Sequence, residues 1–441
     1  PLSALQAGMV FHTQLEQFSG LYHDIVTRQL RSPWRPEAFS QALASCVAEH
    51  PVLRTGFRLD GARPLQFVRR EVALPLRVED LRAMSEPAQE EHLASWTEAH
   101  KRHVFDWERG PLLQVRIFLL AEDRFAFVMS FHHAVLDGWS LAALTTQLYN
   151  RYEAALAGPL PASESNRGFR DFIALEQAAL AEPGAREHFA AMLEDVDPQQ
   201  LPRGGGSDGA RRVRVHRVPG FEEHSHRLPA LARQLGVPVQ QVLLAGHFKV
   251  LSLLSGRRRA VSCVTYNGRP EQDGAEQALG LFLNSLPLAI DTGPGRWRDL
   301  ITRTAAVSAA SVGHRLYPIS RIQQDVGLTF EEVAFNFTNF HVYRDAVAPV
   351  NSELEVLDSD MYEETNFQFL ADFSQALDGD MLFLTLKYDG SVFDQRLIER
   401  IGRYYEAAFA RLAEDIDGSH LAAPLLDESE LTQLRDSRNA T

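Results

Sequence analysis

Cysteine is scarce in this sequence, since Cys46 and Cys263 are its only two among 441 residues. Both lie in apolar surroundings and far apart, so we expect two buried thiols in a reducing compartment and see no reason to propose a disulfide. Basic residues are also in deficit: 58 aspartates and glutamates outnumber 44 lysines and arginines, which leaves a formal net charge of −14. This charge disfavours nucleic acids and anionic membranes as partners.

Long apolar runs are missing as well. No stretch approaches the roughly 20 apolar residues of a membrane-spanning helix. The N-terminus shows no basic run leading into an apolar core, as a signal peptide would. Apolar residues still make up 45% of the chain, which is enough for two domains with hydrophobic cores. We therefore expect a soluble, cytoplasmic protein.

The stretch Phe131–Ser140 concentrates the reactive side chains of the sequence. Before it, the β-rich runs Leu112–Leu120 and Arg124–Ser130 flank a charged turn and predict an antiparallel hairpin. After it, leucines at helical spacing from Leu141 to Leu156 predict a helix. The stretch is therefore expected to form a short loop between a strand and a helix, and such loops often carry chemistry.

Each polar residue of this loop has a chemical capacity. The neutral imidazole of His133 can take a proton from an attacking nucleophile and return it to a leaving group. Asp137 can fix the loop through backbone amides or through an arginine. Gly138 permits a close approach of the substrate or a positive φ. The alternative is a polar corner in which His132 and His133 only satisfy backbone groups, and the adjacent histidines with Asp-Gly argue against it.

These residues carry a resemblance to a known family. His132–Ser140 resembles the HHxxxDGWS signature of condensation domains from nonribosomal peptide synthetases. Other stretches resemble further motifs of that family, in the same order. Pro1–His12 resembles the opening motif, within which the sequence begins, and His50–Phe57 resembles RHExLRTxF, with Glu49 in place of its first arginine. Phe169–Phe172 resembles YxDF, Asn267–Pro270 resembles GR, and Leu279–Pro287 resembles IGxFxNTLP. Gln324–Gly327 keeps the first part of QDVPFE. The resemblance covers the whole chain.

The resemblance implies an α/β fold with two chloramphenicol acetyltransferase-like lobes, forming a V-shaped pseudo-dimer with a substrate tunnel between them. We place the N-terminal lobe with the HHxxxDG loop at 1–165, the C-terminal lobe at 166–426 and a linker toward a following domain at 427–441. We place the boundary between the lobes within the stretch 158–168, because its periodicity is weak. Composition and periodicity alone predict two α/β domains without that topology.

Local patterns predict the main elements. Helices are expected at 1–15, Pro36–Glu49, Glu86–His103, Pro238–Leu254 and Arg396–Ala413, and strands at Val52–Leu59, Ala260–Tyr266, within Leu279–Ile290, Ala334–Val342 and Met381–Tyr388. The histidines of the third of these helices, His92, His100 and His103, are expected to face solvent. The glycine-rich stretch Pro202–Gly209 is interpreted as a surface loop, because no Lys-Ser/Thr pair follows it.

The resemblance also implies a reaction and roles for individual residues. The amine of an acceptor aminoacyl thioester attacks a donor thioester carbonyl, and an amide forms. His133 is expected to act as the base or to orient the amine, His132 to give supporting hydrogen bonds, Asp137 to hold the loop, and Gly138 to lie near the substrate carbonyl. No covalent acyl-enzyme is required.

Two arginines are candidates to support the loop. In the family, an arginine at the position of Arg54 pairs with the signature aspartate, so we expect Arg54 to pair with Asp137. Arg269 is either a second partner of Asp137 or a turn residue, and we favour the former. Candidates to line the substrate tunnel are Trp139, Ser140, which is also a candidate helix cap, Asn284, Ser285 and Asn336.

The expected partners are the upstream donor and downstream acceptor peptidyl carrier proteins and a neighbouring adenylation domain, in antibiotic or siderophore biosynthesis. The chain carries no carrier serine motif and no adenylation signature, so its substrates would arrive on phosphopantetheine arms of carriers. We expect no cofactor or metal in the domain, and a monomer. His224 and His226 have a chelating spacing, but no cysteine or carboxylate pair completes a site.

The opening motif and Leu136 before Asp137 resemble the subtype that accepts donors ending in a D-residue. An epimerisation domain of the same superfamily is one alternative, but its characteristic sequences near Asn267 and at the opening are absent here. A non-catalytic module that recruits a partner enzyme is another, although such relatives lose the signature that this chain keeps.

Overall fold

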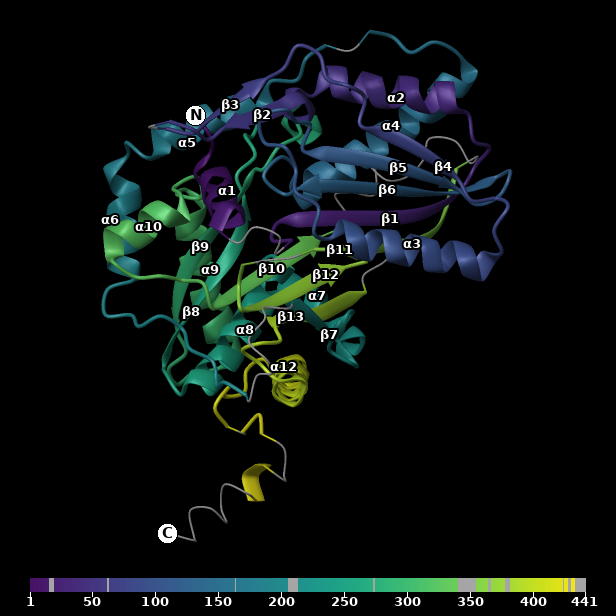
Figure 1. Ribbon diagram of the computed structural model, residues 1–441. Coiled ribbons are helices and arrows are strands. Elements are labelled where there is room, and N and C mark those ends of the chain that lie inside the picture. The colour runs from purple at the N-terminus through teal and green to yellow at the C-terminus, as the bar shows by residue number, and fades with distance from the viewer. Residues whose placement is uncertain are drawn as a thin grey trace. The chain divides into compact units, whose positions relative to one another are not determined.

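The computed structural model describes the chain except residues 16–19, 62, 163, 205–212, 273, 340–353, 364–365, 377–380, 423, 427–429 and 433–441. The chain forms two compact units that alternate along the sequence (Figure 1). The first unit comprises Pro1–Ala181, Asn267–Asn284 and Val342–Asn366, and the second comprises Glu182–Tyr266, Ser285–His341 and Phe367–Thr441.

This division differs from the predicted single boundary after residue 165. The first unit continues to Ala181, and two later segments return to it. A cut at one point therefore does not separate the two units. The assignment of 1–165 and 166–426 as lobes stays a prediction, as does the linker at 427–441, most of which falls outside the described residues.

A five-stranded sheet organises the first unit, in the order β11-β1-β6-β5-β4. Its strands are β1 (His23–Arg31), β4 (Leu76–Asp80), β5 (Leu113–Leu119), β6 (Arg124–His132) and β11 (Glu355–Tyr362). β5 and β6 pair antiparallel, which confirms the predicted hairpin. β6 is central and buried along all but its first residue, as expected for a strand covered on both faces.

Helices cover both faces of this sheet (Figure 1). The unit contains α1 (Ala4–Leu15), α2 (Pro36–Glu49), a 3₁₀ helix (Pro51–Arg54), α3 (Glu86–His100), α4 (Gly138–Ala157), α5 (Gly168–Ala179) and a short 3₁₀ helix (Ala275–Gln277), with a separate two-stranded sheet of β2 (Thr55–Arg58) and β3 (Leu65–Val68). Alternation along β6 sends Phe127 and Met129 into the core beneath α2 and α4, and Ala126 and Val128 into the core beneath α3.

A six-stranded mixed sheet organises the second unit, in the order β7-β13-β12-β10-β8-β9. Its strands are β7 (Val213–Arg217), β8 (Arg259–Asn267), β9 (Leu283–Asp291), β10 (Val333–Asn339), β12 (Phe369–Gln375) and β13 (Leu382–Asp389). Its helices are α6 (Pro183–Met192), a 3₁₀ helix (Phe221–His224), α7 (Arg227–Leu235), α8 (Val239–Ser255), α9 (Trp297–Val312), α10 (Ile319–Val326) and α12 (Gln395–Glu414). Buried α8 packs against α7, α9 and α12. The predicted α/β class is thus confirmed.

Two local predictions are wrong. The predicted strand Val52–Leu59 begins as a 3₁₀ helix, because Pro51 opens a helical turn directly after α2, and β2 starts at Thr55. His92 and His100 of α3, and His103 just after it, are partly buried instead of facing solvent. His100 stacks on Trp96, with ring centroids 4.3 Å apart.

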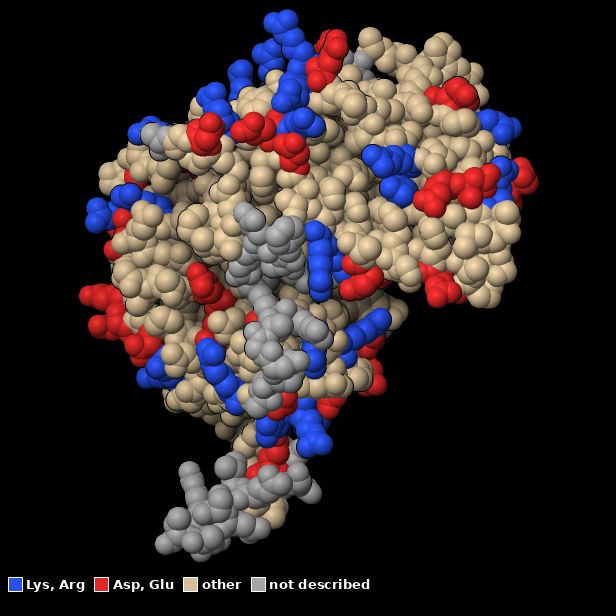
Figure 2. Space-filling view, viewed as in Figure 1, with Lys and Arg blue, Asp and Glu red and all other residues tan. Residues whose placement is uncertain are grey.

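Cys46 and Cys263 are both buried and unbridged. Across the described part of the chain, no single helix is long and apolar enough to cross a membrane. One pair of helices, Phe221–Leu235 and Val239–Ser255, has the combined length and composition, but the pair is bent by 107° at the break between them. Figure 2 shows acidic and basic side chains interspersed over the face in view, so the net negative charge is not gathered there.

Candidate active site

The signature loop joins the end of β6 to the start of α4. His132 is the last residue of β6, and α4 begins at Gly138. β1 runs antiparallel to β6, with His23 opposite His132. The backbone N–H of His133 donates to the carbonyl of Tyr22, 2.8 Å away, just before β1. The loop is therefore fixed against the beginning of β1.

Asp137 ties this loop to a segment more than 130 residues further along the chain. The side chain is fully buried and caps α4, because its Oδ1 accepts from the N–H of Ser140 at 2.7 Å. The other oxygen accepts from the N–H of Phe282 at 3.0 Å, and the N–H of Asp137 donates to the carbonyl of Gly280. These contacts support a structural role for Asp137.

Arg269 is the arginine that pairs with Asp137. Its Nη2 lies 3.2 Å from Asp137 Oδ1 and donates to Ser140 Oγ at 2.7 Å, and its Nη1 donates to the carbonyls of Ala275 and Ala278. Both partners of this ion pair are buried, so the positive charge compensates the buried carboxylate.

The predicted pair between Arg54 and Asp137 is wrong. Arg54 donates instead to backbone carbonyls, including those of Val47 at 2.9 Å, Ala48 at 3.2 Å and Arg69 at 2.6 Å. The cause is local: the 3₁₀ turn after α2 carries the guanidinium back to the end of that helix, where the last carbonyls have no partner within the helix.

His132 is a buried, neutral support for the loop. Its Nδ1 accepts from the N–H of Ala134 at 3.1 Å, so Nε2 carries the hydrogen and donates to Thr13 Oγ1 at 3.1 Å. Thr13 in turn donates to the carbonyl of Met9 in α1. Burial, together with the charges of His133 and His23, lowers the pKa of His132 to about 3.

His133 has the opposite charge state. Its Nδ1 lies 2.9 Å from Oδ2 of Asp24, a β1 carboxylate that is 1% exposed. Burial alone would lower the pKa of His133, but Asp24, aided by Glu363 and Asp137, outweighs burial and raises that pKa to about 9. These carboxylates favour the imidazolium form of His133, and 15% of its side chain is exposed.

The remaining loop residues differ in accessibility. Gly138 is exposed, its φ is not positive, and a Cβ built on it would meet no atom within 4 Å. Ser140 is fully buried, where it accepts from Arg269 and donates to the carbonyl of Gly280 at 2.8 Å, and its role in lining a substrate path stays a prediction. Half-buried Trp139 donates from its ring nitrogen to the carbonyl of Glu276.

Three other candidates for the tunnel fall in different units. Asn284 is buried and belongs to the first unit, whereas Ser285 and Asn336 belong to the second. Asn336 donates from its side-chain amide to Asp372 at 2.9 Å. Their role in lining a substrate path stays a prediction.

Three residues that were not among the sequence-based candidates support the loop: Asp24 contacts His133, Thr13 contacts His132, and Glu176 holds the helix that carries Thr13. Glu176 accepts from the N–H of Ala4 at the start of α1, the helix that carries Thr13. One signal existed for Asp24: a carboxylate stands directly before Ile25 and Val26 in a buried run, where an unpaired charge would be costly.

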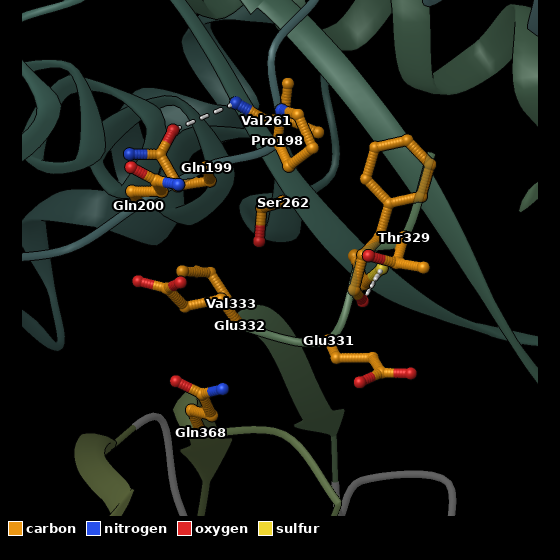
Figure 3. Close-up of a pocket in the computed structure, with 12 residues that line it drawn as sticks. Pro198, Gln199, Gln200, Val261, Ser262, Thr329, Glu331, Glu332, Val333 and Gln368 are labelled. Carbon is orange, nitrogen blue, oxygen red and sulfur yellow. Dashed lines mark hydrogen bonds between the residues drawn. The ribbon is translucent and has the colours of Figure 1, made fainter. Parts of the chain in front are cut away.

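No group of three or more His, Cys, Asp or Glu side chains that could hold a metal occurs among the residues that the structure describes. His224 lies 3.1 Å from Glu406. The second unit contains a pocket of about 260 Å³. Its lining residues include Ser262, Glu331 and Gln368 (Figure 3). None of the predicted site residues lines it.

Fold and loop together define an α/β protein with a histidine-bearing strand-to-helix turn, and the comparisons identify its family. The family model for the Condensation domain matches residues 1–434. The chain therefore belongs to the condensation domain family of nonribosomal peptide synthetases.

The chain is similar to parts of much longer synthetases. It is 32% identical over 440 residues to the AMB antimetabolite synthetase AmbE of Pseudomonas aeruginosa, covering 98% of this chain and 20% of that protein. It is 23% identical over 430 residues to bacitracin synthase 1 of Bacillus licheniformis, covering 94% of this chain and 8% of that protein. The chain thus spans a fifth or less of the length of these relatives.

Solved structures show the same fold. The first condensation domain of the calcium-dependent antibiotic synthetase, in complex with a substrate analogue, aligns with a TM-score of 0.76 at 20% identity, over 97% of this chain and 98% of that one. A chain from the complex of the X-domain and OxyB from teicoplanin biosynthesis aligns with a TM-score of 0.81 at 18% identity, over 97% and 96%. The expected chloramphenicol acetyltransferase-like fold of condensation domains is confirmed.

Proposed function

We propose that this chain joins a donor acyl or peptidyl thioester to the amine of an acceptor aminoacyl thioester, both carried on phosphopantetheine arms of carrier proteins. The observation that carries this proposal is the complete signature loop, in which Asp137 and Arg269 are paired and His133 keeps an exposed edge. Family membership and the synthetase relatives support the same reaction.

The reaction balances without a cofactor. The neutral amine nitrogen attacks the thioester carbon, the C–N bond forms, and the carbonyl electron pair moves to oxygen. The tetrahedral intermediate then restores the C=O bond, the C–S bond breaks, and the proton lost by nitrogen ends on the departing thiol. Holding two tethered reactants together could supply up to about 7–11 kcal/mol of the barrier reduction.

Within this reaction, His133 meets the reacting atoms, His132 and Asp137 hold the loop, and Gly138 leaves room for the substrate carbonyl. Donor and acceptor carriers and a neighbouring adenylation domain are the partners that such a piece of a synthetase requires. Acceptance of a D-configured donor end and a cytoplasmic location remain predictions from the sequence.

The test is a transfer assay followed by intact mass. The protein is mixed with loaded donor and acceptor carriers, beside His133→Ala and a control, His226→Ala, which changes an exposed histidine in the second unit. We expect the donor mass to move to the acceptor carrier, about 10²- to 10⁴-fold more slowly with His133→Ala, as for loss of one proton-transfer or polar catalytic group. His226→Ala should match the wild type.

Other outcomes would identify the alternatives. Exchange of the donor α-hydrogen in deuterated water without transfer would favour an epimerisation domain. If several loaded pairs gave neither transfer nor exchange, the recruiting module would be the better interpretation.

A further inference from the structure

Asp24 is a buried charge for which the proposed reaction gives no reason. It lies on β1, is 1% exposed, and faces the Nδ1 of His133 at 2.9 Å. A buried carboxylate costs several kcal/mol unless an opposite charge compensates it. The ring of His133 can provide that charge when it carries both protons.

The backbone before Asp24 is shaped to hold the pair. Tyr22 has a φ of 61°, which residues with a side chain seldom adopt, and its carbonyl accepts the N–H of His133. Gly20 has a φ of 78°, and a Cβ there would lie 2.6 Å from the carbonyl oxygen of Lys101. Strained backbone beside a candidate site suggests a functional constraint.

The pair also fixes which edge of the imidazole remains available. Nδ1 is buried and faces Asp24, so the exposed part of the His133 ring includes the opposite edge, where Nε2 lies. The backbone bond to Tyr22 and the ion pair to Asp24 hold the residue at two points.

We propose that Asp24 is a positioning residue that keeps His133 as an imidazolium with its Nε2–H directed at the substrate, so that His133 donates a hydrogen bond to the reacting carbonyl oxygen and does not accept the amine proton. This inference rests on the proposed amide-forming reaction and assigns the part that its histidine plays in it.

The chemistry permits this assignment. An α-amine has a pKa of roughly 7.7–8.0, so a substantial fraction is neutral near pH 8 without any base. The charge that develops on the carbonyl oxygen is the one that a fixed cationic donor stabilises. The amine proton passes to the departing thiolate through solvent, and His133 ends each cycle with both of its protons.

Besides Asp24, two carboxylates affect the charge of His133. Glu363 follows β11 and Asp137 belongs to the same loop, and both favour its charged form, whereas His132 is a neutral neighbour. Removing the charge of Asp24 removes the largest effect that opposes burial, so the pKa of His133 should fall toward or below its ordinary 6.5.

The experiment compares wild type, Asp24→Asn, Asp24→Glu and the exposed control Asp358→Asn of β11 in the carrier transfer assay from pH 6 to 9.5. The wild-type rate should rise as the amine loses its proton and fall only above about pH 9. With Asp24→Asn, the rate at pH 8 should drop about tenfold or more, and the deficit relative to wild type should be smaller at pH 6. Asp24→Glu should restore part of the rate, and Asp358→Asn should leave it unchanged.

A faster Asp24→Asn rate at neutral pH, or an unchanged pH profile, would overturn the inference, because a neutral His133 would then serve as well or better. A second measurement guards against a variant that does not fold: nitrogen-15 NMR of the His133 ring in the wild-type chain, assigned with His133→Gln. The ring should carry both protons at pH 8, and one proton there would also overturn the inference. Failure of the wild type to transfer any donor would instead count against the proposed function, while the NMR result would still test the ion pair.

Discussion

At the scale of single residues, substitutions of Gly138 should affect substrate binding and protein stability differently. It is the first residue of α4, and the position of an added Cβ is open space. We expect Gly138→Ala to stabilise the protein by about 0.5–1 kcal/mol, since glycine in a helix costs conformational entropy. Gly138→Leu should also fold, but its side chain would occupy the space that we assign to the substrate.

The measurement is a urea unfolding curve beside the transfer rate for each variant. Transfer should fall about tenfold or more with Gly138→Leu and little with Gly138→Ala. A Gly138→Leu variant that transfers at the wild-type rate would show that the substrate does not approach at this residue.

The supporting arginine shows what residue-level reasoning could and could not predict. The motif made Asp137 and its loop recognisable, and Arg269 was a candidate partner. Which arginine pairs with Asp137 depends on the acceptors that each guanidinium can reach. The end of α2 supplies backbone carbonyls to Arg54, because the chain turns at Pro51 and brings Arg54 back to that helix. Asp24 could not be assigned to His133 from the sequence, because their pairing arises from the register of β1 against β6.

At the scale of elements, α1 is the support that reaches the signature loop from the N-terminus. Gln6 donates to the carbonyl of Ala134 at 2.9 Å, and Thr13 contacts His132. The first turn of α1 is held by Glu176 of α5, whose carboxylate accepts from the N–H of Ala4 at 2.9 Å. A carboxylate at a helix N-terminus is favourable, although this one is also buried.

Glu176 makes this contact dependent on pH. Burial raises the pKa of Glu176 to about 7, against the opposing effect of the Ala4 N–H. In an unfolded chain the pKa of glutamate is about 4.3, so between these values the folded state binds more protons and stability falls as pH rises. The stabilising contribution is complete below about pH 4.3 and is lost through about pH 7.

We therefore expect Glu176→Gln to be more stable than wild type at pH 8, by up to about 3 kcal/mol, and nearly equal to it at pH 4.5. Urea unfolding of both proteins at the two pH values measures the difference, and the exposed Glu90→Gln change in α3 serves as a control. An equal stability of Glu176→Gln and wild type at pH 8 would mean that the ionised carboxylate is not penalised in the folded protein.

Some helices and strands can be predicted from local sequence patterns and others cannot. The apolar periodicity of α2, α8 and α12 places these helices within one or two residues of their observed ends. β11 was missed because most of its side chains are exposed, so it has no apolar alternation to detect. Its strand conformation comes from pairing with β1, a long-range contact that no local pattern encodes.

At the scale of the whole molecule, the first unit is completed by two segments that lie later in the chain, Asn267–Asn284 and Val342–Asn366. β11 pairs with β1 from Ile25↔Tyr362 to Arg31↔Glu355. The segment Asn267–Asn284 supplies Arg269 and the N–H of Phe282 to Asp137. A linear reading of motifs can identify the family, but it cannot show that these returns complete the sheet and the loop.

This interleaving leads to a prediction about fragments. Residues 1–181 alone would leave one side of β1 unpaired and Asp137 buried without Arg269, and breaking a buried ion pair costs about 3–5 kcal/mol. Because a domain is stabilised by only about 5–15 kcal/mol in total, this fragment should lack a cooperative thermal transition and the near-ultraviolet circular dichroism of a packed core. The full chain provides the reference under the same conditions. A sharp transition of the fragment near that of the full chain would show that residues 1–181 already contain what the unit needs, and that the later segments serve the site instead of the fold.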